Sequence, residues 1–480
     1  LLELRGLRAG AALATSLREA LMRLRESGKG VVVFLPMGAG SREMLIASAA
    51  DRIVIGPQST ILPLGVAVET RYFRRALDKI GVLPEIFARG EFKTAGESLA
   101  RDAMSIEQRE QLGALLDVIE NELLGALAEG RKLAPGQVRA LIDGGPYRAK
   151  EAAQHGLVDA MGYDDELPEL LGPEPGTRAH LVDAGSYLAV RGRRPRPNRI
   201  GIVHVRGPIL SRAPFALGRV AVDERVIGAL RRARDSRSVA GVVVIIDSPG
   251  GSVLASDRIY HEVVRLADKK PVVAYFVNVA ASGGYYIAAG AHAIVAQPTT
   301  ITGSIGVVAA HLVLSPLLER LGIVTELVKR GARADMLSAS RPLDAGEREA
   351  MTSEIDGFYR DFVDIVARSR RRPPEEIEKL ARGRVYSGFE AYQLGLVDRL
   401  GGLDAAVDLV REQLGEPREL DAHVMKPPRT AAKAPQAPAP FVAALDATLG
   451  RAARELAALS FGLGPTERVL AWSGLAGLSD

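Results

Sequence analysis

Residues 272–307 read VVAYFVNVAASGGYYIAAGAHAIVAQPTTITGSIGV, and residues 31–66 read VVVFLPMGAGSREMLIASAADRIVIGPQSTILPLGV. The two stretches align without a gap at an offset of 241, and 12 of the 36 aligned positions are identical. Ser41 aligns with Ser282, and the same offset places Lys93 of the first half opposite an alanine. The chain is therefore a diverged tandem duplication. One half keeps a lysine and the other keeps a serine in a glycine-rich turn, which suggests one catalytic centre assembled from both repeats.

Short apolar runs alternate with helical patterns in both repeats. Strands are predicted at Val242–Asp247 and Val272–Val277, with apolar residues at helical spacing between them. Runs that are apolar on both faces are typical of a parallel sheet covered by helices, so each repeat is predicted to be an α/β domain with a mostly parallel sheet and flanking helices. Further strands are predicted at Ala293–Ala296, Ile323–Val328, Val31–Leu35, Arg52–Ile55 and Leu83–Ala88, and helices at Gly284–Ala289 and Leu312–Leu321.

The duplication also sets the predicted domain boundaries. Residues 1–190 form the first repeat, residues 200–415 form the second, and the arginine- and proline-rich stretch 191–199 is a basic linker. Residues 416–480 form a Pro/Ala-rich tail with a candidate amphipathic helix, because leucines recur at helical spacing between 445 and 459. Residue 1 already aligns inside the repeat, so we expect further chain upstream that could carry a signal peptide or membrane anchor.

The amino-acid composition excludes or disfavours several classes of function. The 62 Lys and Arg residues balance 58 Asp and Glu residues to a net charge of +4, so no whole-protein basic field favours nucleic acid. The absence of cysteine excludes disulfides, thiolate nucleophiles and Cys-based zinc sites. The seven histidines form no HExxH or similar ligand pair, so we expect no metal and no other cofactor.

The serine turn has the composition of a nucleophile site. Ser282 lies in NVAASGGYY, residues 278–286, between an apolar strand and a predicted helix. Small neighbours let a peptide carbonyl approach within about 3 Å of the hydroxyl. The segment DSPGGS, residues 247–252, also follows a strand, and the N–H groups of Gly251 and Gly283 could together form an oxyanion hole. Taken alone, Ser282 would equally fit a helix N-cap, and the second segment a simple turn ending in an N-cap serine.

Lys93 is the candidate general base. A lysine acts as a base only when neutral, and lowering its pKa from about 10.4 to near 7 requires desolvation amounting to roughly 4–5 kcal/mol. Most lysines are surface charges, so Lys93 is distinguished by its alignment with Ala334 together with the intact Ser282 turn. Ser304, in TTITGSIG at residues 299–306, could orient the lysine amine, although a turn-forming serine is the simpler interpretation of that motif alone.

Two other arrangements are disfavoured. A Ser-His-Asp triad with His292 or His311 is not supported, because the G-x-S-x-G elbow is missing and neither histidine has an evident place beside the serine. In the first repeat, Arg42-Glu43 follows Ser41, and bulky charged side chains there should block an oxyanion hole. We therefore predict that Ser41 is a relic.

Taken in order, these motifs resemble the tandem-repeat signal peptide peptidase A family, also called protease IV, a bacterial family of Ser-Lys peptidases with the Clp/crotonase fold. The match rests on DSPGGS, AASGGY at residues 280–285, TGSIG at 302–306, and GEFK at 90–93 followed by RDAMS at 101–105. It implies Ser282 as nucleophile, Lys93 as general base, Ser304 as hydrogen-bond partner of the lysine, and Gly251 and Gly283 as oxyanion donors.

The resemblance also implies a cellular role. We expect a membrane-anchored homotetramer at the bacterial inner membrane, facing the periplasm, that degrades signal-peptide remnants. The alternative is a relative on the same fold without peptidase activity, either an acyl-CoA enzyme or an inactive membrane scaffold, neither of which would need both the lysine and the serine. An extended apolar peptide could bind as an added strand beside the two turns, in pockets that we predict to involve Gly250, Val253, Leu254, Val279, Tyr285 and Ile305.

Overall fold

The computed structural model describes residues 1–7, 9–174, 176–190, 199–211, 220–415, 421–425 and 470–472. These residues fall into two compact units. Unit 1 contains those of Leu1–Ala67 and Leu116–Pro197, and unit 2 contains those of Val68–Leu115 and Asn198–Gly477. Val68–Leu115, which belongs to the first repeat by sequence, thus packs with the second. Residues 191–198 of the predicted linker and the predicted tail helix lie outside the described residues.

Unit 1 is built on four parallel strands with helices packed against them. The strand order is β1 (Leu2–Glu3), β2 (Val32–Leu35), β3 (Arg52–Ile55) and β7 (Ala160–Met161). The inner strands contribute apolar side chains to a core shared with the first two helices. The other elements are α1 (Ala11–Glu26), α2 (Ser41–Ala47), the β4–β6 pair (Thr60–Ile61 with Tyr147–Arg148), α6 (Pro135–Gly144), α7 (Ala149–Gln154), α8 (Leu167–Leu170) and α9 (Ala184–Val190).

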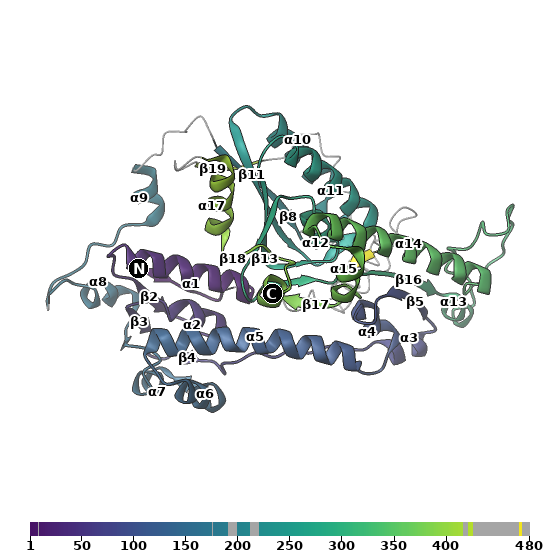
Figure 1. Cartoon of the computed structure of the whole chain (residues 1–480). Helices are drawn as coiled ribbons and strands as arrows, with labels where there is room; N and C mark the ends of the chain where they lie inside the picture. Colours follow the sequence, from purple (N-terminus) through teal and green to yellow (C-terminus); the bar gives the residue numbers. More distant parts are fainter. Residues whose placement is uncertain are drawn as a thin grey trace. The chain divides into compact units, whose positions relative to one another are not determined.

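The larger sheet of unit 2 is also mostly parallel. Its central strand β13 (Val272–Ala281) is buried along its whole length between helical layers, which explains its unbroken apolar sequence. α10 (Asp223–Asp235) and α11 (Val253–Ala267) run side by side across the sheet, and α17 (Leu403–Leu414) lies on its other side (Figure 1). The strand order is β17 (Val385–Ser387), β15 (Ile301–Gly303), β13, β11 (Val239–Ser248), β8 (Arg199–Arg206) and β19 (Asp421–Val424), with β14 (Ala293–Ala296) pairing with β13 and β18 (Arg399–Leu400).

The second sheet of unit 2 carries a strand from the first repeat. β5 (Leu83–Arg89) pairs antiparallel with β16 (Val307–Val313), so the loop that follows β5 enters unit 2 (Figure 1). The strand order is β10 (Ala221–Val222), β9 (Ile209–Leu210), β12 (Gly250–Ser252), β20 (Leu470–Trp472), β16 and β5. The remaining helices are α3 (Arg74–Ile80), α4 (Glu97–Ala100), α5 (Ile106–Arg131, continuing into unit 1), α12 (Gly283–Ala288), α13 (Ser315–Arg320), α14 (Ala345–Arg370), α15 (Pro374–Leu380) and α16 (Gly388–Gln393).

The expected fold class, α/β repeats with mostly parallel sheets, is confirmed, but two predicted elements are wrong. Ile323–Val328 forms no strand: it lies within residues 319–334, all exposed, and has no sheet neighbour among the described strands. Leu312–Leu321 is not one helix, because residues through Val313 belong to β16 and the helix begins only at Ser315. Pro316 fixes that start, since proline is tolerated in the first turn of a helix.

Candidate active site

The three side chains predicted to be catalytic meet within unit 2. Lys93 Nζ lies 2.8 Å from Ser282 Oγ, although 189 positions separate the two residues in sequence. The same amine lies 2.9 Å from Ser304 Oγ and 2.9 Å from the Ser304 carbonyl oxygen. Nζ is therefore held by three oxygen atoms from two turns that follow neighbouring strands, β13 and β15.

The Ser282 backbone directs its hydroxyl toward the lysine. Ser282 occupies the N-cap position of α12, but its side chain makes no cap hydrogen bond. Its φ of 55° and ψ of −117° are unusual for a residue with a side chain, and such a conformation costs on the order of 1–3 kcal/mol. The N–H of Ser282 donates to the Gly303 carbonyl at 2.9 Å, which ties this turn to β15. The N-cap role that the sequence alone left open is not the one observed.

Lys93 is buried in a way that favours its neutral form. The residue is 4% exposed. Burial lowers the pKa of Lys93 well below its ordinary value of 10.5, because an ammonium group loses its hydration in this environment. A neutral amine 2.8 Å from a hydroxyl can accept the proton of that hydroxyl.

The loop that carries Lys93 packs against the Arg382–Arg384 turn, which the sequence analysis did not single out. The Phe92 N–H donates to the Arg382 carbonyl at 2.9 Å. Gly383, with φ of 76°, lies so close to the loop that an added Cβ would stand 2.5 Å from Lys93 Cβ. Only glycine fits there. The Ser304 N–H donates to the Arg384 carbonyl at 2.6 Å, so one short turn contacts both the lysine loop and the Ser304 turn.

A buried glutamine makes a second connection that the sequence analysis missed. Gln111, on α5, is 2% exposed. Its amide nitrogen donates to Thr94 Oγ1 at 2.9 Å and to the Phe92 carbonyl at 3.3 Å, and its amide oxygen accepts from the Val385 N–H at 3.1 Å. The side chain thus joins both flanks of Lys93 to β17. One glutamine inside a helical pattern gives no sequence signal for this role.

The two glycines predicted to form the oxyanion hole also come together. A Cβ at position 283 would lie 2.5 Å from Ser256 Oγ and 3.3 Å from the backbone nitrogen of Gly251. The absence of a side chain at Gly283 therefore allows the two turns to approach each other beside Ser282. Ser252 caps α11 by accepting from the Ala255 N–H at 3.3 Å, which confirms the N-cap expected from the sequence.

Comparison with known proteins identifies the lineage. The profile of peptidase family S49 matches twice, over residues 23–172 and 265–415, once in each repeat. The chain belongs to peptidase family S49. The family resemblance expected from the motifs is thereby confirmed, including its tandem form.

Several relatives of this S49 chain are named proteases. The chloroplastic serine protease SPPA of Arabidopsis thaliana is 33% identical over 412 residues, or 84% of this chain and 61% of that protein. Protease 4 of Haemophilus influenzae is 30% identical, over 83% of this chain and 67% of that protein. The chain thus spans about three fifths to two thirds of the length of these relatives. Among solved structures, a ClpP1 variant of Listeria monocytogenes covers 43% of this chain and 94% of its own, at 19% identity and a TM-score of 0.28.

The predicted pocket residues have different environments. Val279, Tyr285 and Ile305 are buried, and the Tyr285 hydroxyl donates to the Leu396 carbonyl at 2.8 Å. Gly250 and Val253 are also buried, whereas Leu254 is 51% exposed.

The histidines of the alternative triad are engaged elsewhere. His292 Nδ1 accepts from the Val272 N–H at 3.1 Å. His311 contacts Glu85 at 2.8 Å through Nδ1 and the Ser338 carbonyl at 3.0 Å through Nε2. Neither ring is hydrogen-bonded to Ser282, so the geometry gives the Ser-His-Asp arrangement no support.

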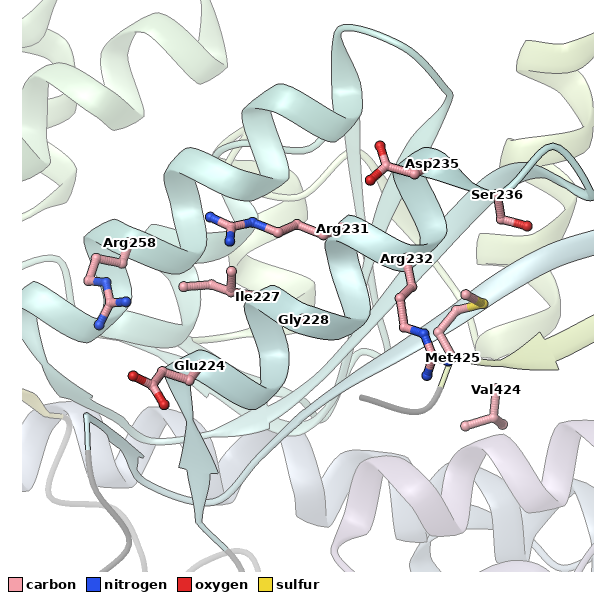
Figure 2. Close-up of a pocket in the computed structure, with 10 residues that line it drawn as sticks. All are labelled: Glu224, Ile227, Gly228, Arg231, Arg232, Asp235, Ser236, Arg258, Val424 and Met425. Atoms are coloured by element: carbon pink, nitrogen blue, oxygen red, sulfur yellow. The ribbon is translucent and has the colours of Figure 1, made fainter. Parts of the chain in front are cut away.

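An open cavity of about 1010 Å³ lies along α10 (Figure 2), and neither Ser282 nor Lys93 is among its lining residues. Two of its arginines already form ion pairs, Arg231 with Glu262 at 2.9 Å and Arg258 with Asp223 at 2.5 Å. None of the predicted site residues lines it. Its walls are formed by Glu224, Ile227, Gly228, Arg231, Arg232, Asp235, Ser236, Arg258, Val424 and Met425.

The described residues offer neither a metal-binding cluster nor a membrane-spanning helix. No group of three or more His, Cys, Asp or Glu side chains in that part of the chain is arranged to hold a metal ion. No helix there combines the length and the apolar character needed to span a bilayer.

Proposed function

We propose that this chain is a serine endopeptidase with a Ser-Lys dyad. The observation that carries the proposal is the 2.8 Å contact between Ser282 Oγ and the buried amine of Lys93. Lys93 takes the hydroxyl proton as Ser282 attacks the scissile carbonyl, and the N–H groups of Gly251 and Gly283 stabilise the oxyanion. Lys93 then protonates the leaving amine, and a water molecule activated by the same lysine hydrolyses the acyl-enzyme. Ser304 holds the amine in orientation throughout.

The substrate in this proposal is an extended, mostly apolar peptide that adds a strand beside the nucleophile. Support comes from the backbone of Leu470–Trp472, which pairs antiparallel with Gly250–Ser252 and with Val308 of β16. An extended segment therefore fits between the strands that border the Ser282 and Gly251 turns. Backbone hydrogen bonds in such a slot bind peptides without regard to their sequence, and apolar pockets then select the side chains.

The cellular part of the proposal comes from the relatives and the family resemblance. One relative, from Enterococcus faecium, is named a putative signal peptide peptidase and is 36% identical over 38% of this chain and 54% of its own length. We propose released signal peptides as substrates and a homotetramer at the bacterial inner membrane, facing the periplasm, as the working form. A competition assay with a leucine-rich signal-peptide core, an equally long acidic peptide and a tightly folded protein tests this specificity. Preferred cleavage of either of the latter two would refute it.

The dyad itself is tested by labelling with a serine-reactive fluorophosphonate. We expect wild-type protein to be labelled at Ser282, and Ser282→Ala and Lys93→Ala to remain unlabelled. Ser41→Ala serves as the matched control and should label like wild type. Undiminished labelling of Lys93→Ala would show that another group activates the serine.

A further inference from the structure

One apolar segment of unit 2 is left without a partner. Val324 and Val328 are 85% and 88% exposed, and Leu321, Ile323 and Leu327 beside them are also exposed. No backbone group from Val324 through Val328 is hydrogen-bonded to the backbone of another described residue. Five large apolar side chains exposed within residues 321–328 are more typical of an interaction site than of an ordinary surface.

The duplication shows which element this segment corresponds to. The offset of 241 that aligns the repeats equates Val324–Arg330, VTELVKR, with β5, LPEIFAR. Glutamate and arginine recur at the third and seventh positions, apolar residues recur at the first, fourth and fifth, and glycine follows both segments. The second repeat therefore keeps a sequence of the β5 type, which explains why the sequence analysis predicted a strand there.

The same offset identifies the surface that would receive it. In unit 2, β5 pairs with β16. The equivalent of β16 in the first repeat is Val66–Tyr72, VAVETRY. Val66, Val68, Thr70 and Tyr72 are half-buried whereas the three residues between them are exposed, the period-two pattern of a strand with one covered face. Val66–Tyr72 belongs to no sheet among the described strands.

Most other elements of this region occur in both repeats. The offset of 241 relates α3 to α13, β3 to β14, and α5 to α14. The helices α5 and α14 are each 26 residues long. The strand pair differs between the repeats: β5 with β16 is formed, whereas its counterpart, residues 324–330 with residues 66–72, is not. The chain thus presents both halves of one unformed strand pair.

We propose that Val324–Arg330 of one copy of this chain pairs antiparallel with Val66–Tyr72 of the next copy. The β5–β16 register, carried over by the offset, places Val324 opposite Tyr72 and Val328 opposite Val68. Each copy donates one strand and receives another, so the contact is head to tail and generates a closed ring or an open filament. The inference deepens the assembly part of the proposed function. It rests on the duplication and not on the roles of Ser282 and Lys93, so either can fail without the other.

Disulfide trapping tests the register on a background that contains no cysteine. Facing residues of an antiparallel pair have Cα atoms about 4.5–5.5 Å apart, within the range a disulfide spans. Val68→Cys and Val328→Cys should give a linked dimer when the two single variants are co-expressed and oxidised, and no dimer when either is expressed alone. Val68→Cys with Lys329→Cys is the control, because a shift of one residue turns the side chain to the opposite face.

Several outcomes would overturn the proposal. These are equal linkage in the shifted pair, linkage of Val328→Cys to itself, an intrachain disulfide when both cysteines are in one chain, and absence of linkage in the co-expressed pair.

A charge substitution gives a second readout. Val328→Glu should dissociate the assembly to a protomer of 51.1 kDa in sedimentation experiments, because the carboxylate would have to be buried in the new sheet. Val328 is exposed in the single chain, so this variant should fold. Val190→Glu, at a valine that is 90% exposed in unit 1, is the matched control and should leave the assembly intact. An unchanged assembly with Val328→Glu, or equal dissociation with Val190→Glu, would contradict the strand exchange.

Discussion

Ser282 and Ser41 occupy the same position of two duplicated turns and make different contacts. Ser282 has a positive φ and its hydroxyl receives a hydrogen bond from Lys93. Ser41 is the first residue of α2, and its hydroxyl donates to the Gly65 carbonyl at 2.7 Å and accepts from the Gly65 N–H at 3.0 Å. The position of a serine at a strand-to-helix turn therefore does not by itself decide its chemical role. What it contacts decides whether it can be a nucleophile or a local structural link.

The residues after each serine reinforce the difference. Gly283 lets the Gly251 turn approach Ser282. In the first repeat Arg42 aligns with Gly283, and the carboxylate of the next residue, Glu43, accepts from the N–H groups of Gly40 at 3.0 Å and Leu7 at 2.9 Å. These two N–H groups are therefore paired with a carboxylate, and a negative charge so near the serine turn would disfavour a developing oxyanion. Divergence thus changed both the group that the serine contacts and the residues that follow it.

The largest expected effect comes from removing the Ser282 hydroxyl. Ser282→Ala should lower kcat/KM on an internally quenched apolar peptide by at least roughly 10³-fold, since no covalent intermediate can form. Circular dichroism and thermal unfolding should show a folded protein, because alanine can take the same buried place. If Ser282→Ala and Ser41→Ala lost comparable activity, the two turns would not differ in the way described.

Lys93 should give a pH signature in both activity and stability. Activity should rise with pH through the lowered lysine pKa, because only the neutral amine is a base, and neither Lys93→Met nor Lys93→Arg should retain it. At neutral pH the unfolded chain binds a proton at this lysine that the folded chain does not. The stability of wild type relative to Lys93→Met should therefore increase with pH between the lowered pKa and 10.5.

Urea unfolding of the two proteins at neutral and alkaline pH measures this difference. A stability difference that stays constant with pH would show that the lysine is charged in the fold. A fully active Lys93→Arg protein would refute the lysine-base mechanism, because a guanidinium group stays protonated.

The sequence predicted the Ser-Lys pair because the two repeats could be compared with each other position by position. Lys93 opposite Ala334, and Gly283 opposite Arg42, are differences between two copies of one ancestor and required no structure. The Arg382–Arg384 turn and Gln111 could not be found this way, because their roles depend on where α5 and β17 pack. A pattern within one segment does not report such contacts.

The failed strand at Ile323–Val328 has a related cause. Its residues favour an extended conformation, but a strand also needs a neighbour to pair its backbone groups. Local sequence predicts the first property and not the second. For β5 the neighbour is β16 of the other repeat, and both conditions are met.

Ser304→Ala should have an intermediate effect. The variant removes one of the three oxygens around Lys93 Nζ and keeps the Ser304 carbonyl, so the amine stays in place with less constraint on its orientation. We expect kcat to fall by about 10–1000-fold, the range of a group that assists proton transfer indirectly. Loss of activity equal to that of Ser282→Ala would mean that Ser304 takes part in the reaction itself.

Gln111→Leu should have a smaller effect on rate. The variant leaves the Phe92 carbonyl, the Thr94 hydroxyl and the Val385 N–H without this partner, which loosens the loop on both sides of Lys93. Small displacements of a catalytic group cost up to about 10²-fold, so we expect kcat to fall roughly 10-fold with KM little changed. Gln137→Leu, at a glutamine on α6 whose amide caps Ala134, is the control. A change in KM alone would assign Gln111 to substrate binding instead.

The smallest effect on catalysis, and the one that most sharpens the comparison, is expected for Ser41→Ala. Its hydroxyl makes two hydrogen bonds to the backbone of Gly65 and none to an amine, so its removal should leave kcat/KM within about twofold of wild type. The same substitution should lower stability by about 1–2 kcal/mol, because both Gly65 backbone groups lose a partner that water replaces only in part. Thermal unfolding and peptide hydrolysis measured on one preparation separate these effects. A Ser41→Ala protein of unchanged stability would show that the contact with Gly65 contributes little, and a large loss of activity would show that the first turn still takes part in catalysis.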